Sequence, residues 1–359
     1  MAPAARRAVP VAVTAAAEPA PSGRQAVDWC RPSRVVEPWV ASADVVPACR
    51  GQEVVVAGSV EVERVYGALA EAAGLVGVVP EGDAVRRVLA GHEDLLGDAV
   101  VVFSMTASAS GSGGLDMSMT VPADHVDPYA FALSSGLIEP TDHPVGSVIS
   151  DLQERFPIGM YGIDLDVSGG FKKAYAAFPS DDLRDVSELV GVPSMPRSVA
   201  DNAELLNRYG LGTVQGVSVD YRRNEINLYC DRISTEALEP EFVRSLLRDM
   251  GLRAAGEQGL EFAKRTFAIY PTLSWESSRI ERICFAVITT DPTTTPTTSE
   301  PEVSQMWKYA TNAPFDYERR ALVYGLALSA EKEYYKLGSY FQVSDHQRRL
   351  VKAFEALTD

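Results

Sequence analysis

QGVSVD at residues 215–220 and RNEINLYC at residues 223–230 alternate between two kinds of side chain. A period of two is typical of β-strands, in which successive side chains point to opposite faces. The two residues between the segments predict a hairpin. One face of the second strand is mostly apolar and must pack against something. The other face carries Arg223, Glu225, Asn227 and Tyr229.

Three other predicted strands repeat this pattern, with an apolar face opposite a face that bears a cation. The charged faces include Phe171, Lys173 and Tyr175 in residues 171–178, Arg282 and Cys284 in residues 280–288, and Lys336 and Tyr340 in residues 336–341. Several strands therefore combine one cation with tyrosines or polar groups on a single face.

Two architectures explain such strands. The first is an open antiparallel sheet, with helices on its apolar face and water on its polar face. The second is a closed barrel, with helices outside and a wet, cationic lumen inside. Buried cations without partners are costly, so such a lumen makes sense only if it holds an anion and water. The alternation alone leaves both architectures open.

The order of the predicted elements favours the barrel. From Val62 onward the chain repeats a unit of helix, strand, strand and helix, which predicts ten strands in five hairpins. The strands are expected at residues 99–106 and 115–121, 159–167 and 171–178, 215–220 and 223–230, 266–274 and 280–288, and 321–328 and 335–343. Closure of these strands would remove exposed sheet edges. We therefore expect a single α+β domain at residues 60–359, a ten-stranded antiparallel barrel inside a ring of helices. Residues 1–59 are expected to be a disordered or loosely attached extension.

Composition limits the possible partners. The net charge of −16 argues against nucleic acid or an anionic membrane as a partner. No apolar run is long enough to span a membrane. The four cysteines lack metal-ligand spacing, which fits a reducing compartment. We expect a cytoplasmic monomer.

Common catalytic motifs are missing from the sequence. There is no phosphate-binding glycine loop before a helix, no nucleophile elbow, and no metal-ligand spacing among the histidines. The DDLRD stretch at residues 181–185 resembles the metal-binding motif of helical isoprenoid synthases. It directly follows a predicted strand, so we expect Ser180 and these acids to cap a helix.

The cations on the charged strand faces point to a different chemistry. Lys173, Arg223, Arg282 and Lys336 fall on four hairpins, and Tyr270 lies on the strand before Arg282. Converging cations and phenolic hydroxyls would bind a diphosphate through charge-assisted hydrogen bonds. Asp116 lies on an otherwise apolar or hydroxylic strand. Beside a diphosphate it would bind Mg²⁺ through its oxygens, although it would also suit a strand-end surface position.

The chain resembles the soluble ABBA-type aromatic prenyltransferases. The resemblance runs from about residue 61 to the C-terminus, whereas the first sixty residues have no counterpart. It favours the Mg²⁺-dependent members over the metal-independent aminocoumarin-pathway ones. The stretches that carry it include VERVYGALAEAAGL, LDMSMTVP, GGFKKAYAAFPSD, DYRRNEINLY, RICFAVI and EYYKLGSYF.

This resemblance implies a ten-stranded barrel whose lumen holds a prenyl diphosphate and an aromatic acceptor, and it assigns roles to residues. Asp116 would bind Mg²⁺, and Tyr175 and Tyr229 would lie along the prenyl chain. The diphosphate would be held by Lys173, Arg223, Asn227, Tyr270, Arg282 and Lys336. The acceptor side would include Gln215, Phe267, Tyr340, Gln347 and Leu350, with Ser104, Ser118 and Asp164 nearby. Gly216, Ala268 and His346 depart from the family pattern on that side, which leaves the acceptor open.

The resemblance also implies a mechanism. The cations Lys173, Arg282 and Lys336 would stabilise the departing diphosphate, and Tyr175 would stabilise the allylic cation. An electron-rich ring carbon would then attack in a Friedel–Crafts alkylation, with water or Tyr340 accepting the ring proton. Two hypotheses compete with this one: a non-catalytic barrel that binds a small molecule, and a metal-dependent isoprenoid synthase that acts through DDLRD.

Overall fold

The structure is a computed structural model, and it describes most of the chain after the N-terminal extension. The described residues are 59–107, 114–231, 233, 237–294, 301–317 and 320–343. The helix expected over residues 345–357, together with Gln347 and Leu350, lies outside them. Nearly all of the expected extension at residues 1–59 also lies outside them.

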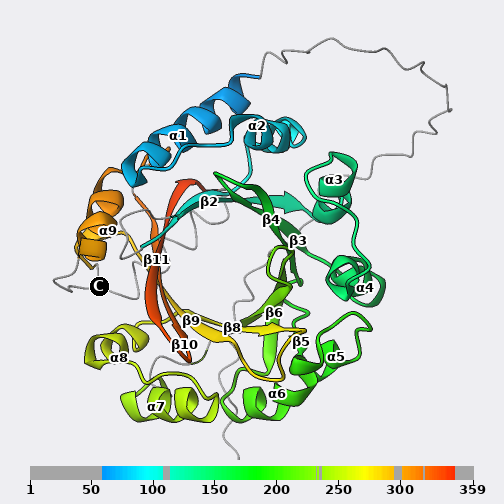
Figure 1. Ribbon diagram of the computed structural model, residues 1–359, viewed down its shortest axis with the longest axis vertical. Helices are drawn as coiled ribbons and strands as arrows, with labels where there is room; N and C mark the ends of the chain where they lie inside the picture. Colours follow the sequence, from blue (N-terminus) through cyan, green and yellow to red (C-terminus); the bar gives the residue numbers. More distant parts are fainter. Residues whose placement is uncertain are drawn as a thin grey trace, which may run out of the picture.

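Ten antiparallel strands close into a barrel (Figure 1). They are β1 (Val101–Thr106), β2 (Gly114–Pro122), β3 (Met160–Asp166), β4 (Gly170–Ala177), β6 (Thr213–Asp220), β7 (Glu225–Cys230), β8 (Ala268–Ser274), β9 (Arg282–Thr289), β10 (Leu322–Ser329) and β11 (Glu333–Gln342). Sequential strands pair with one another, and β11 pairs with β1 to complete the ring. The two-residue strand β5 (Arg184–Asp185) pairs with β6 and is not one of the ten barrel strands. The structure thus confirms the closed barrel and excludes the open sheet.

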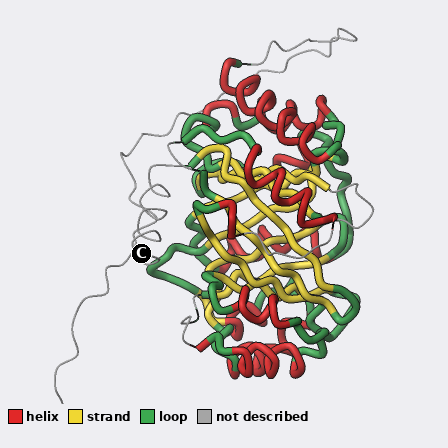
Figure 2. The backbone as a smooth tube through the Cα atoms, turned by 90° about the vertical axis from the view of Figure 1, so that its left-hand side faces the viewer, coloured by secondary structure: helices red, strands yellow, loops and turns green. Residues whose placement is uncertain are grey.

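Helices surround the barrel on its outside (Figures 1 and 2). They are α1 (Val60–Val76), α2 (Gly82–Ala90), α3 (Pro128–Ser134), α4 (Val148–Arg155), α5 (Val186–Val190), α6 (Arg197–Arg208), α7 (Pro240–Asp249), α8 (Glu257–Ala263) and α9 (Pro301–Asn312), with short 3₁₀ turns η1 (Glu93–Leu95), η2 (Pro144–Ser147) and η4 (Pro292–Thr294). The hydrophobic core lies between the helices and the outer strand faces, where Phe103, Met105 and Phe285 are fully buried. Among the described residues, no helix combines the length and the apolar character needed to cross a membrane.

The hairpin between β6 and β7 differs from its prediction at the turn. The Asp220 carboxylate accepts hydrogen bonds from the backbone amides of Arg222 and Arg223, both at 3.1 Å. Asn224 adopts a left-handed conformation with φ of 51°, which asparagine tolerates better than most residues. The turn therefore contains four residues instead of two, and Arg223 lies in it rather than on the strand.

Strand β4 contains a bulge that the alternation did not predict. Asp164 of β3 pairs with Lys173, but the next residue, Leu165, pairs with Phe171, so Lys172 is an extra residue. An inserted residue shifts the side chains beyond it to the opposite face. The prediction that Phe171 shares a face with Lys173 is therefore wrong. Phe171 packs in the outer hydrophobic core, where it is 2% exposed.

The DDLRD stretch caps a helix, but not through the residue expected. Asp185, its last acid, accepts a hydrogen bond from the Ser187 amide at 2.8 Å, and Glu188 accepts one from the Asp185 amide. This capping box starts α5, so the expectation that Ser180 is the N-cap is wrong. Asp182 forms an ion pair with Arg184. Asp181 and Asp182 are exposed on the outside of the barrel.

Candidate active site

Charged side chains gather at one end of the barrel lumen because strand pairing aligns them. Along the ring, Asp164 pairs with Lys173, Lys173 with Asp220, and Asp220 with Glu225. Thr272 pairs with Arg282 on the neighbouring strands β8 and β9. We call this set the charged end of the lumen, and its members are Asp116, Asp164, Lys172, Lys173, Asp220, Arg223, Glu225, Arg282 and Lys336.

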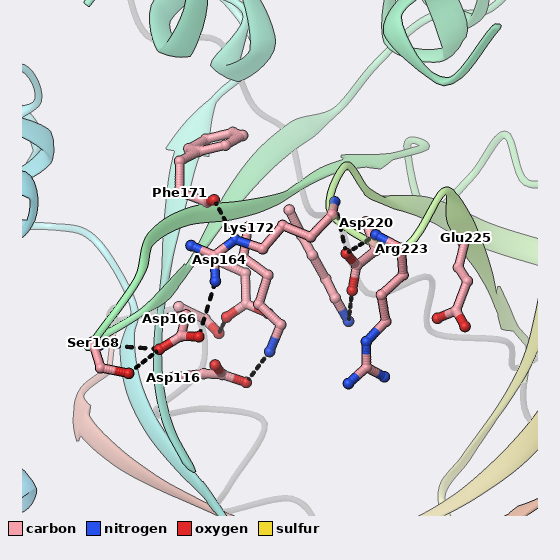
Figure 3. A network of polar contacts seen from close by, with 12 residues as sticks. Asp116, Asp164, Asp166, Ser168, Phe171, Lys172, Asp220, Arg223 and Glu225 are labelled. Carbon is pink, nitrogen blue, oxygen red and sulfur yellow. Dashed lines mark hydrogen bonds and ion pairs between the residues drawn. The ribbon is translucent and has the colours of Figure 1, made fainter. Parts of the chain in front are cut away.

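Most cations of the charged end are paired with a carboxylate. Lys172 Nζ lies 2.5 Å from Asp116 Oδ2, and Lys173 Nζ lies 3.7 Å from Asp220 Oδ2. Figure 3 shows Lys172 reaching Asp116, with Arg223 and Glu225 extending from the β6–β7 hairpin on the same side. The paired lysines thus lie around the same end of the lumen, where they could bind the oxygens of a diphosphate.

Arg282 on β9 and Lys336 on β11 complete the charged end. These strands follow the β6–β7 hairpin around the barrel on the side away from β4. The two terminal nitrogens of Arg282 donate to the two Glu225 oxygens at 3.0 and 2.6 Å. Lys336 has no ion pair with any other described residue. Its Nζ lies 5.8 Å from the centroid of the Tyr334 ring.

Burial and neighbouring charges perturb the pKa values of these groups. Burial lowers the pKa of Lys173 and of Lys336, and in each case other lysines or Arg282 lower it further. Burial also lowers the pKa of Lys172, but the carboxylates of Asp116 and Asp164 outweigh this effect and leave it raised. Perturbed pKa values cluster at functional sites.

Asp116 has the properties of a ligand for a hard cation. Burial and the nearby Asp164 carboxylate raise its pKa, and Lys172 only partly offsets them. One of its oxygens bonds to Lys172, and the other has no hydrogen-bond partner among the described residues. Within the described part of the chain, no three His, Cys, Asp or Glu side chains gather to hold a metal ion. Proteins often bind Mg²⁺ through one or two carboxylates together with substrate phosphates, and Asp116 could supply one such carboxylate.

Deeper in the lumen the lining changes from charges to tyrosines. The ring centroids of Tyr229 and Tyr270 are 4.5 Å apart, and those of Tyr175 and Tyr229 are 5.7 Å apart. Tyr175 donates to Asp164 Oδ2 at 3.2 Å, which joins this layer to the charged end. Burial raises the pKa of Tyr175, Tyr229, Tyr270 and Tyr340, so all four remain neutral phenols.

The structure brings several predicted polar residues into hydrogen-bond networks along the wall. Ser118 donates to Asp164 Oδ1 at 2.8 Å. Asn227 donates to Ser218 at 2.7 Å and accepts from Thr272 at 2.5 Å. Ser104 is paired across the sheet with Asp116.

The described residues predicted to line the acceptor side, Gln215, Phe267 and Tyr340, lie towards the opposite end of the barrel. Gln215 precedes Gly216 at a register shift, is exposed, and donates to Asp231 at 2.8 Å. Phe267 directly precedes β8, and its amide donates to Ala286. Tyr340 pairs with Val102 on β1. Register therefore separates these positions from the charged end.

Sequence reasoning missed three members of the site. Regular alternation from Phe171 to Tyr175 would put Lys172 on the outer face, because its bulge has no signature in the sequence. Asp220 is the last residue of the predicted strand, and the alternation gives no sign that it caps the turn and pairs with Lys173. Glu225 was recognised as an added negative charge, but its partner Arg282 follows 57 residues later and only the structure joins them.

Comparisons with known proteins agree with this architecture. The family model described as "Aromatic prenyltransferase Orf2" matches residues 60–354. A Streptomyces anulatus protein, 5,10-dihydrophenazine-1-carboxylate 9-dimethylallyltransferase, is 38% identical over 82% of this chain and 98% of its own length.

Two further relatives are similarly close. The furaquinocin biosynthesis prenyltransferase of Streptomyces sp. (strain KO-3988) is 39% identical over 79% of this chain and 91% of its own length. The flaviolin linalyltransferase of Streptomyces virginiae is 36% identical over 79% and 94%. Matches of this extent, together with a closed barrel whose lumen is charged at one end and lined by tyrosines beyond it, show that the chain belongs to the aromatic prenyltransferase family.

Proposed function

We propose that this enzyme transfers a dimethylallyl or geranyl group from its diphosphate to an electron-rich aromatic ring, with release of diphosphate. The observation that carries the proposal is the order of the lumen lining. Five cations, three of them paired with carboxylates, lie at one end, and a layer of neutral tyrosines follows. This order matches the charge and the hydrocarbon chain of an allylic diphosphate placed head to tail.

The cations would act on the leaving group. Lys173, Arg282 and Lys336 are positioned to donate charge-assisted hydrogen bonds to diphosphate oxygens, and negative charge grows on those oxygens as the C1–O bond breaks. Because these groups are fixed by strands, little reorganisation is needed during the reaction. Asn227 and Tyr270 would add neutral donors beside them.

The tyrosines would protect and stabilise the allylic cation. The faces of Tyr175, Tyr229 and Tyr270 present electron density to a passing cation, and the closed barrel limits access of water. The ring carbon of the acceptor forms a bond to the allylic carbon and then loses its proton. Since burial raises the pKa of Tyr340, this residue is a neutral phenol whose oxygen accepts the proton only transiently, in passing it to water.

We also propose that Mg²⁺ takes part, held by Asp116 and the diphosphate. When bound, the ion would neutralise charge on the leaving group. The Asp116 oxygen that has no hydrogen-bond partner among the described residues, and the neighbouring Asp164 carboxylate, support this assignment.

The substrate class is inferred from the relatives. Their names specify dimethylallyl and linalyl groups and aromatic acceptors such as dihydrophenazine-1-carboxylate and flaviolin. We therefore propose phenazines and polyhydroxylated naphthalenes as the acceptors to test first.

A product assay tests the function. The full chain is incubated with dimethylallyl, geranyl or farnesyl diphosphate and with a panel of phenazines, hydroxynaphthalenes and flavonoids, with Mg²⁺ or with EDTA, and products are detected by mass spectrometry. We expect prenylated aromatics that fall sharply with EDTA or with Asp116→Ala. Ligand binding without any product would favour a non-catalytic barrel. Undiminished turnover in EDTA would remove the proposal for Mg²⁺.

A further inference from the structure

The contact between Glu225 and Arg282 occupies the groups that a diphosphate would use. Arg282 offers a fork of N–H donors that suits bidentate binding of phosphate. In this structure the fork is filled by the Glu225 carboxylate, at 3.0 and 2.6 Å. The side chains are 13% and 15% exposed, so water screens the pair only weakly.

Carboxylates nearly balance the cations of the charged end. Its five cations are Lys172, Lys173, Arg223, Arg282 and Lys336, and its four carboxylates are Asp116, Asp164, Asp220 and Glu225. Of these cations, Arg223 and Lys336 alone have no ion pair with another described residue. A diphosphate with several negative charges would therefore meet a site with little net positive charge.

We propose that Glu225 makes donor binding depend on a divalent cation, because it holds Arg282 and cancels one positive charge where the diphosphate docks. The inference rests on the proposed function and deepens it. A diphosphate alone would compete with Glu225 for Arg282 and would be repelled by it. A diphosphate that carries a divalent cation has less negative charge, so it would share Arg282 with Glu225 at a lower cost. Glu225 is thus also a positioning residue, since it fixes the direction of the guanidinium.

Binding of inorganic diphosphate tests this role without catalysis. Isothermal titration of the full chain gives the Kd with MgCl₂ and with EDTA, and the ratio of the two is the readout. For the wild type we expect binding in MgCl₂ to be much tighter. In Glu225→Gln, which keeps the shape and loses the charge, we expect binding in EDTA to tighten about tenfold or more, as for loss of about 1.4 kcal/mol of repulsion. Binding in MgCl₂ should change far less.

Two control variants isolate the charge of Glu225. Glu225→Asp keeps the carboxylate and should keep the wild-type ratio. Asp201→Asn also removes one carboxylate, but Asp201 lies on the outer helix α6, where it pairs with Arg197 at 3.4 Å. Its ratio should also remain that of the wild type. Thermal melting of each variant confirms folding, and Glu225→Ala replaces Glu225→Gln if the latter is unfolded.

The possible outcomes separate this inference from the proposed function. If the neutral variant binds no tighter in EDTA than the wild type, Glu225 only positions Arg282 and the inference is wrong. Equal binding by the wild type in MgCl₂ and in EDTA would also overturn it. If the folded wild type binds diphosphate under neither condition, the proposed function itself fails.

Discussion

At the scale of single residues, Lys336 differs from the other strand-borne cations of the charged end because it forms no ion pair with a described carboxylate. Its ammonium can therefore bind a diphosphate without first giving up an ion pair. A hydrogen bond to a charged group contributes about 1.5–3 kcal/mol, so Lys336→Met should raise the KM for the donor about 10- to 100-fold. Lys332→Met, the same change at an exposed position in the β10–β11 turn, is the control and should leave donor KM unchanged. Equal donor KM values for the two variants would exclude this role of Lys336.

The lowered pKa of Lys336 predicts a pH dependence of donor binding. Because burial lowers this pKa below 10.5, the ammonium loses its proton at a lower pH than an exposed lysine does. Donor affinity should therefore fall as pH rises, and kcat/KM for the donor should decline on the alkaline side. The sign for stability is opposite, because the unfolded chain binds the additional proton, so the free energy of unfolding rises with pH over the same window. Lys336→Arg should extend activity to higher pH, and an unchanged alkaline limb would contradict this assignment.

Some site residues could be found from sequence because alternation alone places them. Lys173, Tyr175 and Arg282 lie on regular stretches of strand, where a period of two fixes the face. The position of Lys172 in the lumen could not be predicted, because a bulge depends on the pairing of two strands and the sequence of one strand does not specify it. Ion pairs such as Glu225 with Arg282 likewise depend on register between strands.

At the scale of elements, the outward position of DDLRD makes it a structural motif. Asp181→Asn with Asp182→Asn should leave turnover unchanged, because both acids are exposed outside the lumen. Asp185→Ala should lower the free energy of unfolding by about 1 kcal/mol, since it removes the cap of α5. Product assays and urea denaturation measure the two effects. Loss of turnover in the double variant would revive the isoprenoid-synthase hypothesis.

Elements were easier to predict than their ends. All ten barrel strands were expected near their observed positions, because alternation and turn residues mark them. The start of β7 was misplaced because side-chain hydrogen bonds from Asp220 lengthen the turn. The start of α5 was misplaced for a similar reason, since several acids in DDLRD could serve as caps and the choice depends on β5.

At the scale of the whole molecule, closure of the sheet joins five amphipathic hairpins into a barrel with an enclosed lumen. Alternation alone could not distinguish an open sheet from a barrel, because both bury one strand face. The pairing of β1 with β11, which joins residues from the two ends of the described chain, settles that difference. Closure also places Lys173 of β4 beside Asp220 of β6, one of the ion pairs between nearby strands by which the charges inside are tolerated.

Closure also predicts where the barrel is sensitive to added volume. Gly216 lies at the pairing of β6 with β4, and a Cβ atom there would meet the Ala176 carbonyl oxygen at 2.8 Å and Ala177 Cα at 3.0 Å. These are backbone atoms, so Gly216→Ala should force the strands apart and lower the free energy of unfolding by about 1–3 kcal/mol. Gly67→Ala in α1 is the matched control, since no atom lies within 4 Å of its added Cβ. Because alanine favours a helix interior, it should raise stability by about 0.5–1 kcal/mol. Urea denaturation measures both, and a Gly216→Ala protein as stable as the wild type would show that this pairing is not tightly closed.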